Sequence, residues 1–307
     1  MDAFRVDARQ ARRAFERAAR RGEDPRALQG EVERRMLERL DLVRLVPKRI
    51  LDAGCGSGRG LSLLRGRYPG ADLLGADFAH AAVRAASRSG SLASRLRQLL
   101  RRGSSAHLCA DFARLPLAAA TVDLVWSNLA LAWAADLPSA LREFHRVLAP
   151  GGLLMFSSYG PDTLKELRSS FPANARARRV HAFADMHDVG DVLVACGFSA
   201  PVMDVEVITM TYACVEDLVR DLRASGQTCA SSDRPKSLTG RGTWRGMTSA
   251  YERERRNGRL PATVEVVYGH AWKGEPRVAS DGRQIVKWAK KNPGAEGLSR
   301  RNVACPA

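Results

Sequence analysis

The N-terminal part of the chain carries an apolar stripe at helical spacing. The stripe consists of Leu28, Val32, Met36, Leu37 and Leu40. Because positions three or four residues apart share one face of a helix, the spacing predicts helix across residues 4–45. Gly22 and Pro25 interrupt the pattern, and both residue types break helices. We therefore expect two helices with a break near residues 22–25.

From residue 48 onward, short apolar runs alternate with helical stretches. The expected strands are residues 49–53, 72–76, 106–109, 122–127 and 152–157. The expected helices between them are residues 58–67, 79–90 and 136–148. Strands that alternate with helices are typical of βαβ units, which build a parallel sheet covered on both faces. The pattern predicts an α/β fold with a Rossmann-like, doubly wound and mostly parallel sheet.

The pattern is looser after residue 160. We expect helices at residues 161–170, 185–196 and 215–224, and strands at residues 202–211 and 263–268. Residues 225–243 are polar and basic and contain glycine, which is typical of a loop or lid. Residues beyond 273 show little periodicity, and we expect a mobile tail there.

The composition indicates a folded protein that does not cross a membrane. With 307 residues, 45% of them hydrophobic, the chain can build a large core. No run of about 18 uncharged apolar residues occurs, so no membrane span is predicted. The N-terminus has basic residues but lacks the apolar segment of a secretory signal. We expect a cytoplasmic protein.

The cysteines show no pattern of a metal site or of a disulfide framework. They are Cys55, Cys109, Cys196, Cys214, Cys229 and Cys305. None forms a CxxC pair, and no histidine lies near them at metal-ligand spacing. Reduced thiols are the favoured interpretation, and no bound metal is expected.

The formal net charge of +16 favours an acidic partner. A nucleic acid, an anionic membrane surface or an acidic protein would each fit this charge. Aromatic residues make up only 6% of the chain, and no RRM or KH signature is present. Nucleic acid is therefore the less favoured partner.

A glycine-rich stretch, ILDAGCGSGRG at residues 50–60, follows the first expected strand of the sheet. It lacks the lysine of a Walker A loop. The dinucleotide fingerprint GxGxxG would need glycine at position 59 or 61, where the chain has Arg59 and Leu61. The pattern present is D-x-G-x-G-x-G, formed by Asp52, Gly54, Gly56 and Gly58. Glycines in this turn allow positive φ and let the backbone approach a ligand closely.

Further acids follow the next two strands. Asp77 comes about 20 residues after the glycines, where a carboxylate would bind ribose hydroxyls. Asp111 ends the third strand beside Phe112, and this pair suits the amino group and the ring of an adenine. Ligands bind outside the carboxyl ends of the strands in an open parallel sheet. The three features can therefore converge on one adenosine.

These motifs resemble the class I S-adenosylmethionine (SAM)-dependent methyltransferases. The segments that carry the resemblance are LDAGCGSG, GADF, ADFARLPL, VDLVWSNLALAW and RVLAPGGLLMFS, within residues 48–160. Any one of them alone would be weak, but all occur in order and at the proper spacing. The resemblance implies SAM as the cofactor.

Other segments narrow the resemblance to one family, the malonyl-acyl carrier protein O-methyltransferases of biotin synthesis. These segments are SNLALAW at 127–133, GPDTLKELR at 160–168, MHDVGDVL at 186–193 and YGHAW at 268–272. The resemblance spans residues 6–273 and implies methylation of the free carboxylate of a malonyl thioester. It also implies an acidic acyl carrier protein as the partner, with malonyl-coenzyme A as the alternative carrier.

The residues and the resemblance together assign a site. Candidate cofactor residues are Gln29, Asp52, Gly54, Cys55, Gly56, Gly58, Asp77, Phe78, Asp111, Phe112, Asn128 and Leu129. Candidate substrate or partner residues are Trp133, His181, Arg234, Lys236, Arg241 and Arg245. Asn128 and Tyr159 are candidates for positioning the reactants. No acid or base is assigned, because a carboxylate is already ionised at neutral pH.

The resemblance has two departures, and other functions stay open. One is Ala132, where the family has a glutamine. The family has a tyrosine in the N-terminal break, where this chain has Gly22. A methyltransferase for another small acid or a quinone is one alternative. A nucleic-acid-binding protein or RNA methyltransferase is a second, and a non-catalytic relative is a third.

The expected organisation has three parts. Residues 1–47 are N-terminal helices that cover the active site. Residues 48–273 are the methyltransferase domain, with a helical or loop lid near residues 161–245. Residues 274–307 are the basic tail.

Overall fold

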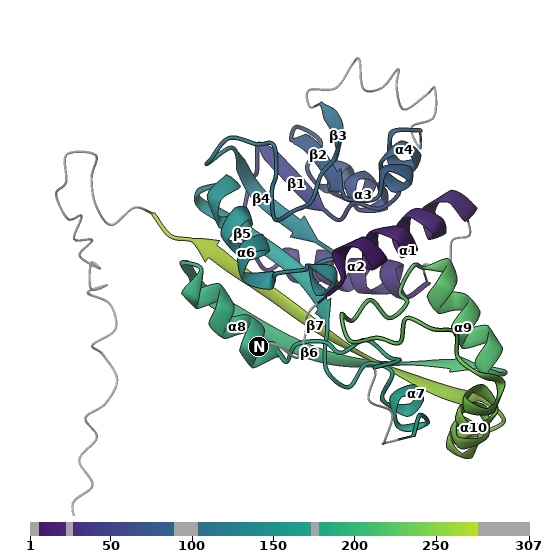
Figure 1. The fold of residues 1–307 in the computed structure, drawn as a ribbon. Coiled ribbons are helices and arrows are strands. Elements are labelled where there is room, and N and C mark those ends of the chain that lie inside the picture. Colours follow the sequence, from purple (N-terminus) through teal and green to yellow (C-terminus); the bar gives the residue numbers. More distant parts are fainter. Residues whose placement is uncertain (1–5, 23–26, 89–103, 173–177, 276–307) are drawn as a thin grey trace, which may run out of the picture. The chain divides into compact units, whose positions relative to one another are not determined.

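The computed structural model describes residues 6–22, 27–88, 104–172 and 178–275. Up to Gly274 these residues belong to one compact unit, built on a seven-stranded sheet (Figure 1). The strands are β1 (Arg49–Ala53), β2 (Asp72–Asp77), β3 (Ser105–Cys109), β4 (Val122–Ser127), β5 (Leu148–Tyr159), β6 (Phe198–Tyr212) and β7 (Leu260–Lys273). Their order in the sheet is β3-β2-β1-β4-β5-β7-β6.

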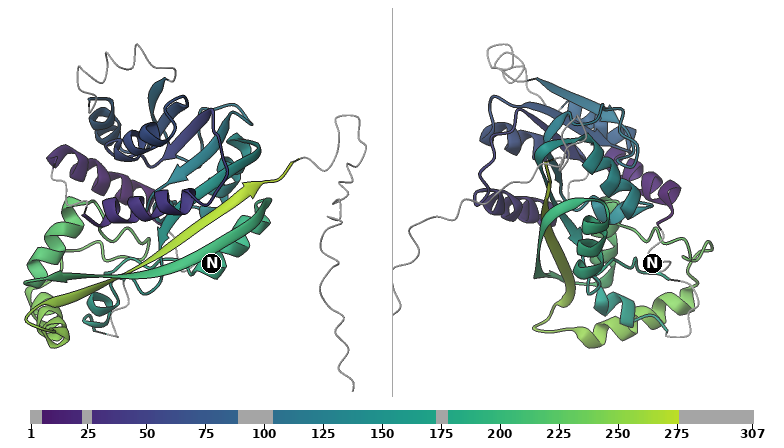
Figure 2. Two further views of the ribbon diagram at one scale, coloured as in Figure 1. Left: turned by 180° about the vertical axis from the view of Figure 1, so that it is seen from behind. Right: turned by 90° about the vertical axis from the view of Figure 1, so that its left-hand side faces the viewer.

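The sheet is parallel except for one strand. Strands β1 to β5 pair in parallel, whereas β7 runs antiparallel to both β5 and β6. Figure 2 shows β6 and β7 side by side as the longest strands of the sheet. Strands β2 and β3 are added on one side of β1, and β4 and β5 on its other side. The parallel strands therefore have a topological switch point between β1 and β4. The predicted doubly wound, mostly parallel sheet is confirmed.

Helices cover both faces of the sheet. They are α1 (Ala8–Arg21), α2 (Ala27–Leu40), α3 (Arg59–Arg67), α4 (His80–Arg88), α6 (Leu137–Val147), α7 (Lys165–Ser169), α8 (Met186–Ala195), α9 (Val215–Ala224) and α10 (Arg241–Tyr251), with the 3-10 turns η2 (Leu131–Trp133) and η3 (Glu252–Glu254). Side chains alternate along β4, where Leu124 and Trp126 join one core and Val125 joins the other. Helices α2 and α3 contribute to the first core, and α6 and α8 to the second.

The two N-terminal helices form as the apolar pattern predicts. Asp7 caps α1 by accepting a hydrogen bond from the Gln10 amide. Gly22 ends the helix in the left-handed conformation, with φ of 67°. Helix α1 packs against α4 and α9, and α2 packs against β5 (Figure 1). These contacts bring the N-terminal segment to the carboxyl edge of the parallel strands.

The C-terminal half differs from the expectation in detail. Helix α10 begins within the expected loop 225–243 and continues to Tyr251, where no element was predicted. Gly242 and Gly246 give this segment a low helix propensity, which is why the sequence did not predict the helix. The helix expected at 161–170 is confined to Lys165–Ser169, and the middle of the expected lid segment 161–245 contributes β6 to the sheet. The expected tail lies outside the described residues after Glu275. Among the described helices, none is long and apolar enough to cross a membrane.

Candidate functional site

A cavity of about 370 Å³ lies where the carboxyl ends of β1, β2 and β4 meet α1 and α2. Strand ends and the turns after them contribute Asp52, Gly54, Cys55, Gly56, Asp77, Phe78, Asn128 and Leu129 to its wall. The N-terminal helices contribute Phe15, Gly22, Gln29 and Glu33. Most residues that the sequence predicts for the cofactor are therefore brought together here, and we call this space the cofactor cavity.

The glycine turn after β1 needs glycine for space as well as for backbone conformation. Gly54, Gly56 and Gly58 have φ values of 86°, 54° and 85°, all in the left-handed region. A Cβ on Gly54 would lie 2.2 Å from the Cβ of Ala130. A hydrogen bond to β2 holds the turn in place, since the Gly54 amide donates to the Ala76 carbonyl at 2.7 Å. The backbone of the turn is consequently exposed to the cavity.

Asp77 ends β2 beside the same turn. Its Oδ2 accepts a hydrogen bond from the Gly56 amide at 3.0 Å, and its Oδ1 accepts one from the Ala79 amide at 2.8 Å. Burial raises the pKa of Asp77, and these two hydrogen bonds oppose that rise. Each carboxylate oxygen keeps a further lone pair for a ligand hydroxyl. The position suits the ribose role expected from the sequence.

Asp52 is a buried acid at the end of β1, with 3% of its surface exposed. Burial raises its pKa well above the ordinary 3.8, and the nearby charges of Glu33 and Asp77 raise it further. Within the described ranges, Asp52 forms no ion pair with a lysine or arginine. The cavity therefore has an acidic floor that favours a cationic ligand.

The raised pKa of Asp52 makes stability depend on pH. The folded chain keeps a proton on Asp52 that the unfolded chain releases. The contribution of Asp52 to the free energy of unfolding is therefore fully present below its ordinary pKa of 3.8, and it is lost as pH rises through the pKa of the folded state. Asp52→Asn cannot ionise. We expect its melting temperature, without cofactor, to rise relative to the parent protein between about pH 4 and pH 8. A difference in melting temperature that stays constant across this range would contradict the assignment.

Asn128 connects β4, β5 and α2 at the edge of the cofactor cavity. Its Nδ2 donates to the Gln29 carbonyl on α2 at 3.0 Å, and its Oδ1 accepts from Ser157 Oγ at 2.9 Å. The Leu129 amide donates to the same Ser157 Oγ at 2.9 Å. Asn128 thus holds the covering helix in register with the sheet.

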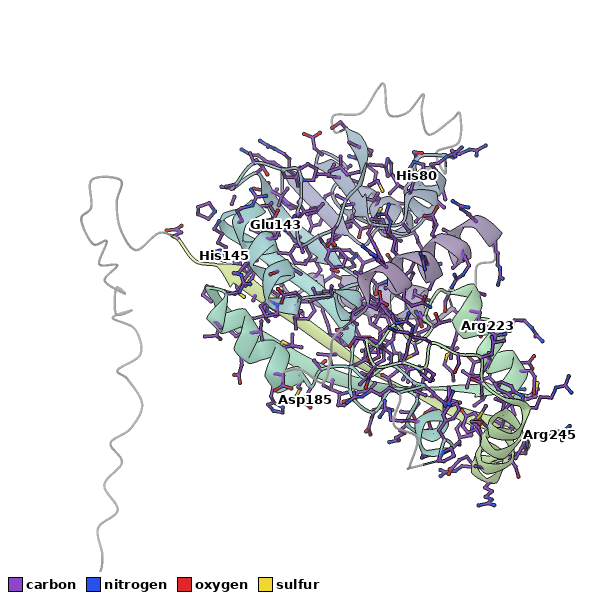
Figure 3. The ribbon with its side chains drawn as sticks, viewed as in Figure 1. His80, Glu143, His145, Asp185, Arg223 and Arg245 are labelled. Carbon is purple, nitrogen blue, oxygen red and sulfur yellow. The ribbon has the colours of Figure 1, made fainter. Side chains whose placement is uncertain are left out.

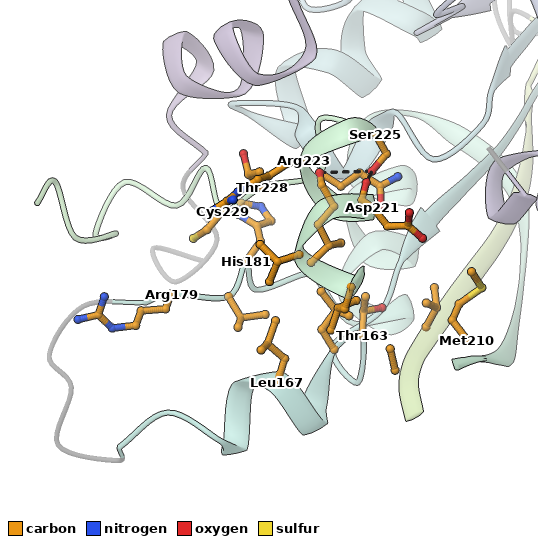
Figure 4. Close-up of a pocket in the computed structure, with 18 of the residues that line it drawn as sticks. Thr163, Leu167, Arg179, His181, Met210, Asp221, Arg223, Ser225, Thr228 and Cys229 are labelled. Carbon is orange, nitrogen blue, oxygen red and sulfur yellow. Dashed lines mark hydrogen bonds between the residues drawn. The ribbon is translucent and has the colours of Figure 1, made fainter. Parts of the chain in front are cut away.

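A second cavity, of about 230 Å³, adjoins the first and is mostly apolar (Figure 4). Gln29, Trp133, Ser225 and Gln227 line both cavities. In Figure 4 the Arg179 guanidinium extends away from His181 and Leu167, and its Nη1 donates to the Thr239 hydroxyl at 3.2 Å. We call this space the substrate cavity.

Aromatic side chains line the substrate cavity next to the wall that it shares with the cofactor cavity. The rings of Trp133 and His181 stack with their centroids 4.9 Å apart, and Tyr159 lies 5.0 Å from Phe183. Burial lowers the pKa of His181 to about 4 and raises the pKa of Tyr159, so both are neutral near pH 7. Trp133 Nε1 and His181 Nδ1 are buried and find no hydrogen-bond partner in the described chain. These atoms are available to a polar ligand.

Three of the predicted cofactor residues lie outside the cavity wall. Phe112 is buried and packs against Phe144, with ring centroids 5.9 Å apart. Asp111 is exposed, and its Oδ1 accepts from the Ala113 amide at 2.9 Å. Gly58 begins α3. Neither Asp111 nor Phe112 is part of the cavity wall, although the Phe112 ring lies 6.5 Å from that of the wall residue Phe78. Their adenine-binding role stays a prediction.

The structure adds residues that the sequence analysis did not assign. Phe15 on α1 contacts the edges of Phe78 and Trp133, with centroid distances of 5.7 and 5.2 Å. Glu33 on α2 is buried in the same wall. Gly22 also lines the cavity, and a Cβ there would meet no atom within 4 Å. Gly22 is the position to which the resemblance assigns the family's tyrosine. The described residues contain no cluster suited to a metal ion.

Comparisons with known proteins agree with this geometry. Residues 51–156 match the family model of a methyltransferase domain. The malonyl-[acyl-carrier protein] O-methyltransferase of Methylovorus sp. (strain MP688) is 49% identical, over 94% of this chain and 96% of the relative. The enzyme of that name from Laribacter hongkongensis (strain HLHK9) is 48% identical, over 95% and 99%.

The chain belongs to the malonyl-[acyl-carrier protein] O-methyltransferase family. The family membership and the domain match confirm the expected enzyme class, a methyltransferase that uses SAM. Among solved structures, the YcgJ protein of Bacillus subtilis matches with a TM-score of 0.54 at 14% identity, over 78% of this chain and 98% of that protein. This likeness confirms the fold.

SAM fits the residues of the cofactor cavity. The acidic floor suits its net positive charge, the bare glycine turn admits its close approach, and Asp77 is placed for ribose hydroxyls.

Proposed function

We propose that this protein transfers a methyl group from SAM to the free carboxylate of a malonyl thioester held on an acyl carrier protein, early in biotin synthesis. The observation that carries the proposal is the shared wall of Gln29, Trp133, Ser225 and Gln227 between an acidic, glycine-lined cavity and an apolar one. A cofactor and an acyl substrate can meet across this wall. We place the reaction in the cytoplasm.

The chemistry needs alignment more than proton transfer. SAM supplies a methyl group on a sulfonium. The malonyl carboxylate is ionised at neutral pH and can attack in line without a base. The site residues must therefore hold the two reactants about 3–3.5 Å apart and remove water from the carboxylate. This explains why neutral groups suffice at the shared wall.

The proposed roles follow from the contacts. Asn128 positions α2 over the reactants through the Gln29 carbonyl. Tyr159, Trp133 and His181 supply neutral hydrogen-bonding groups beside the substrate. A neutral imidazole next to the carboxylate leaves the nucleophile its charge, whereas a fixed cation would lower its reactivity. The surrounding apolar side chains exclude water.

A basic surface near the substrate cavity is proposed to receive the acidic carrier protein. Lys236, Arg241 and Arg245 are exposed, and Thr239 and Trp244 between them line the cavity. Figure 3 shows Arg245 projecting outward at the end of the molecule where Arg223 also projects. We call Lys236, Arg241 and Arg245 the docking surface.

Arg234 does not belong to the docking surface, although the sequence suggested it. Its Nη1 lies 2.8 Å from Oδ2 of Asp7, and its side chain is 19% exposed. This ion pair ties the loop to the N-cap of α1. Arg234 therefore has a structural role here.

Charge reversal on the docking surface tests the partner. We expect Arg241→Glu combined with Arg245→Glu to raise KM for malonyl-carrier protein roughly 10-fold and to weaken its dependence on salt. The fold should tolerate the change, because an acid at position 241 is favourable in the first turn of α10 and Arg245 is exposed. Arg44→Glu, at an exposed site shortly before the start of β1, is the control. Equal KM values for the two variants would argue against this surface.

The proposed function is tested by complementation of a strain that cannot begin biotin synthesis. We expect growth without biotin when this protein is expressed, which would also show that Gly22 is tolerated. A folded protein that binds SAM but supports no growth would favour another methyl acceptor.

A further inference from the structure

The cofactor cavity contains an ion pair with no assigned role. Arg59 at the start of α3 places Nε 3.2 Å from Oε2 of Glu33 on α2, and both residues line the cavity. The Glu33 side chain is 5% exposed, whereas that of Arg59 is 55% exposed. Arg59 also occupies the position at which a dinucleotide fingerprint would have its third glycine. The wall thus presents one buried acid and one accessible cation.

Two glycines inside helices make room for this pair. A Cβ on Gly30 of α2 would lie 2.8 Å from Nη2 of Arg59. A Cβ on Gly60 of α3 would lie 2.8 Å from Oε1 of Glu33 and 2.7 Å from Oδ2 of Asp52. Glycine weakens a helix relative to alanine, so both helices lose some stability to accommodate charged groups at the cavity. This arrangement is what a ligand site requires.

The charges of SAM can be matched to the two ends of the cavity. Asp77 ends β2 and is placed for the ribose, so the amino-acid end of the ligand extends toward β1, β4 and α2. That end carries an ammonium and a carboxylate at neutral pH. Glu33 is the acidic side chain of this part of the wall, with the buried Asp52 beside it, and Arg59 is the guanidinium in the same lining.

We propose that Glu33 binds the ammonium group, and Arg59 the carboxylate group, of the methionine end of SAM. The inference rests on SAM being the cofactor of the proposed function. A guanidinium suits the carboxylate because two parallel N–H groups can donate to its two oxygens. Glu33 and Arg59 then act as two halves of one recognition site for an amino acid.

Calorimetry with three ligands tests each contact separately. The ligands are SAM, decarboxylated SAM, which keeps the ammonium, and 5′-methylthioadenosine, which lacks the amino-acid end. The variants are Glu33→Gln and Arg59→Leu. Glu38→Gln, an exposed position on the same helix, is the matched control. Melting temperatures without ligand report whether each variant folds.

Glu33→Gln is expected to lower the affinity for SAM and for decarboxylated SAM about 10- to 100-fold and to leave the affinity for 5′-methylthioadenosine unchanged. Arg59→Leu is expected to lower the affinity for SAM by a similar factor and to leave the affinity for decarboxylated SAM unchanged. Equal losses for all three ligands, or no losses, would overturn the assignment. If these losses occur in a protein that methylates no malonyl thioester, the inference stands and the proposed function fails.

Discussion

Gly60→Ala is expected to lower the affinity for SAM by about 10- to 100-fold. The added Cβ would lie 2.7 Å from Oδ2 of Asp52 and 2.8 Å from Oε1 of Glu33, which is too close for either contact. Both carboxylates are buried in the wall of the cofactor cavity, so a shift of either one changes the shape of that wall. Calorimetric titration with SAM measures the effect.

Gly66 supplies a matched control on the same helix. A Cβ at Gly66 would meet no atom within 4 Å. Gly66→Ala should keep the affinity for SAM and increase the free energy of unfolding by up to about 1 kcal/mol. If the two alanine variants bind SAM equally well, the carboxylates around Gly60 do not shape the cofactor cavity.

Asn128→Ala is expected to reduce kcat by about 100-fold, because a reactant displaced by about 1 Å loses that much rate. The substitution removes the hydrogen bond to the Gln29 carbonyl and leaves Ser157 Oγ without its acceptor. Helix α2 then loses its connection to the end of β4. We also expect a loss of about 2–3 kcal/mol in the free energy of unfolding.

Ser127→Ala separates the positioning role of Asn128 from its contribution to stability. Ser127 is buried, and its Oγ donates to the Ala53 carbonyl at 2.9 Å, away from α2. This control should lose stability, by about 1 kcal/mol, with kcat within a factor of about 3 of the parent. A similar fall in kcat for both variants would mean that Asn128 acts through stability alone.

The fold could be predicted from the sequence because its signals are local. Strands 49–53 and 122–127 are short apolar runs buried on both faces, and their observed bounds agree with the expected ones. Helix α10 was missed since tertiary packing of Met247 and Tyr251, both buried, outweighs its two glycines.

Residue patterns alone indicated the part of the site where one motif sets the geometry, whereas Gln29 and Asn128 were expected from the family resemblance. The glycine turn and Asp77 adjoin each other because β1 and β2 pair in the sheet. Glu33 and Arg234 depend on contacts between segments far apart in the chain, Glu33 with Arg59 and Arg234 with Asp7. Asp111 follows β3 as expected, and its Oδ1 accepts a hydrogen bond from the Ala113 amide in the local turn.

The central claim is that the methyl acceptor is the free carboxylate of a malonyl group. The most direct test incubates the purified protein and SAM with malonyl-carrier protein and, separately, with acetyl-carrier protein, which has no free carboxylate. Mass spectrometry of the acyl-pantetheine arm should show one added methyl group on the malonyl form and none on the acetyl form. Methylation of neither form, or of both equally, would contradict the account.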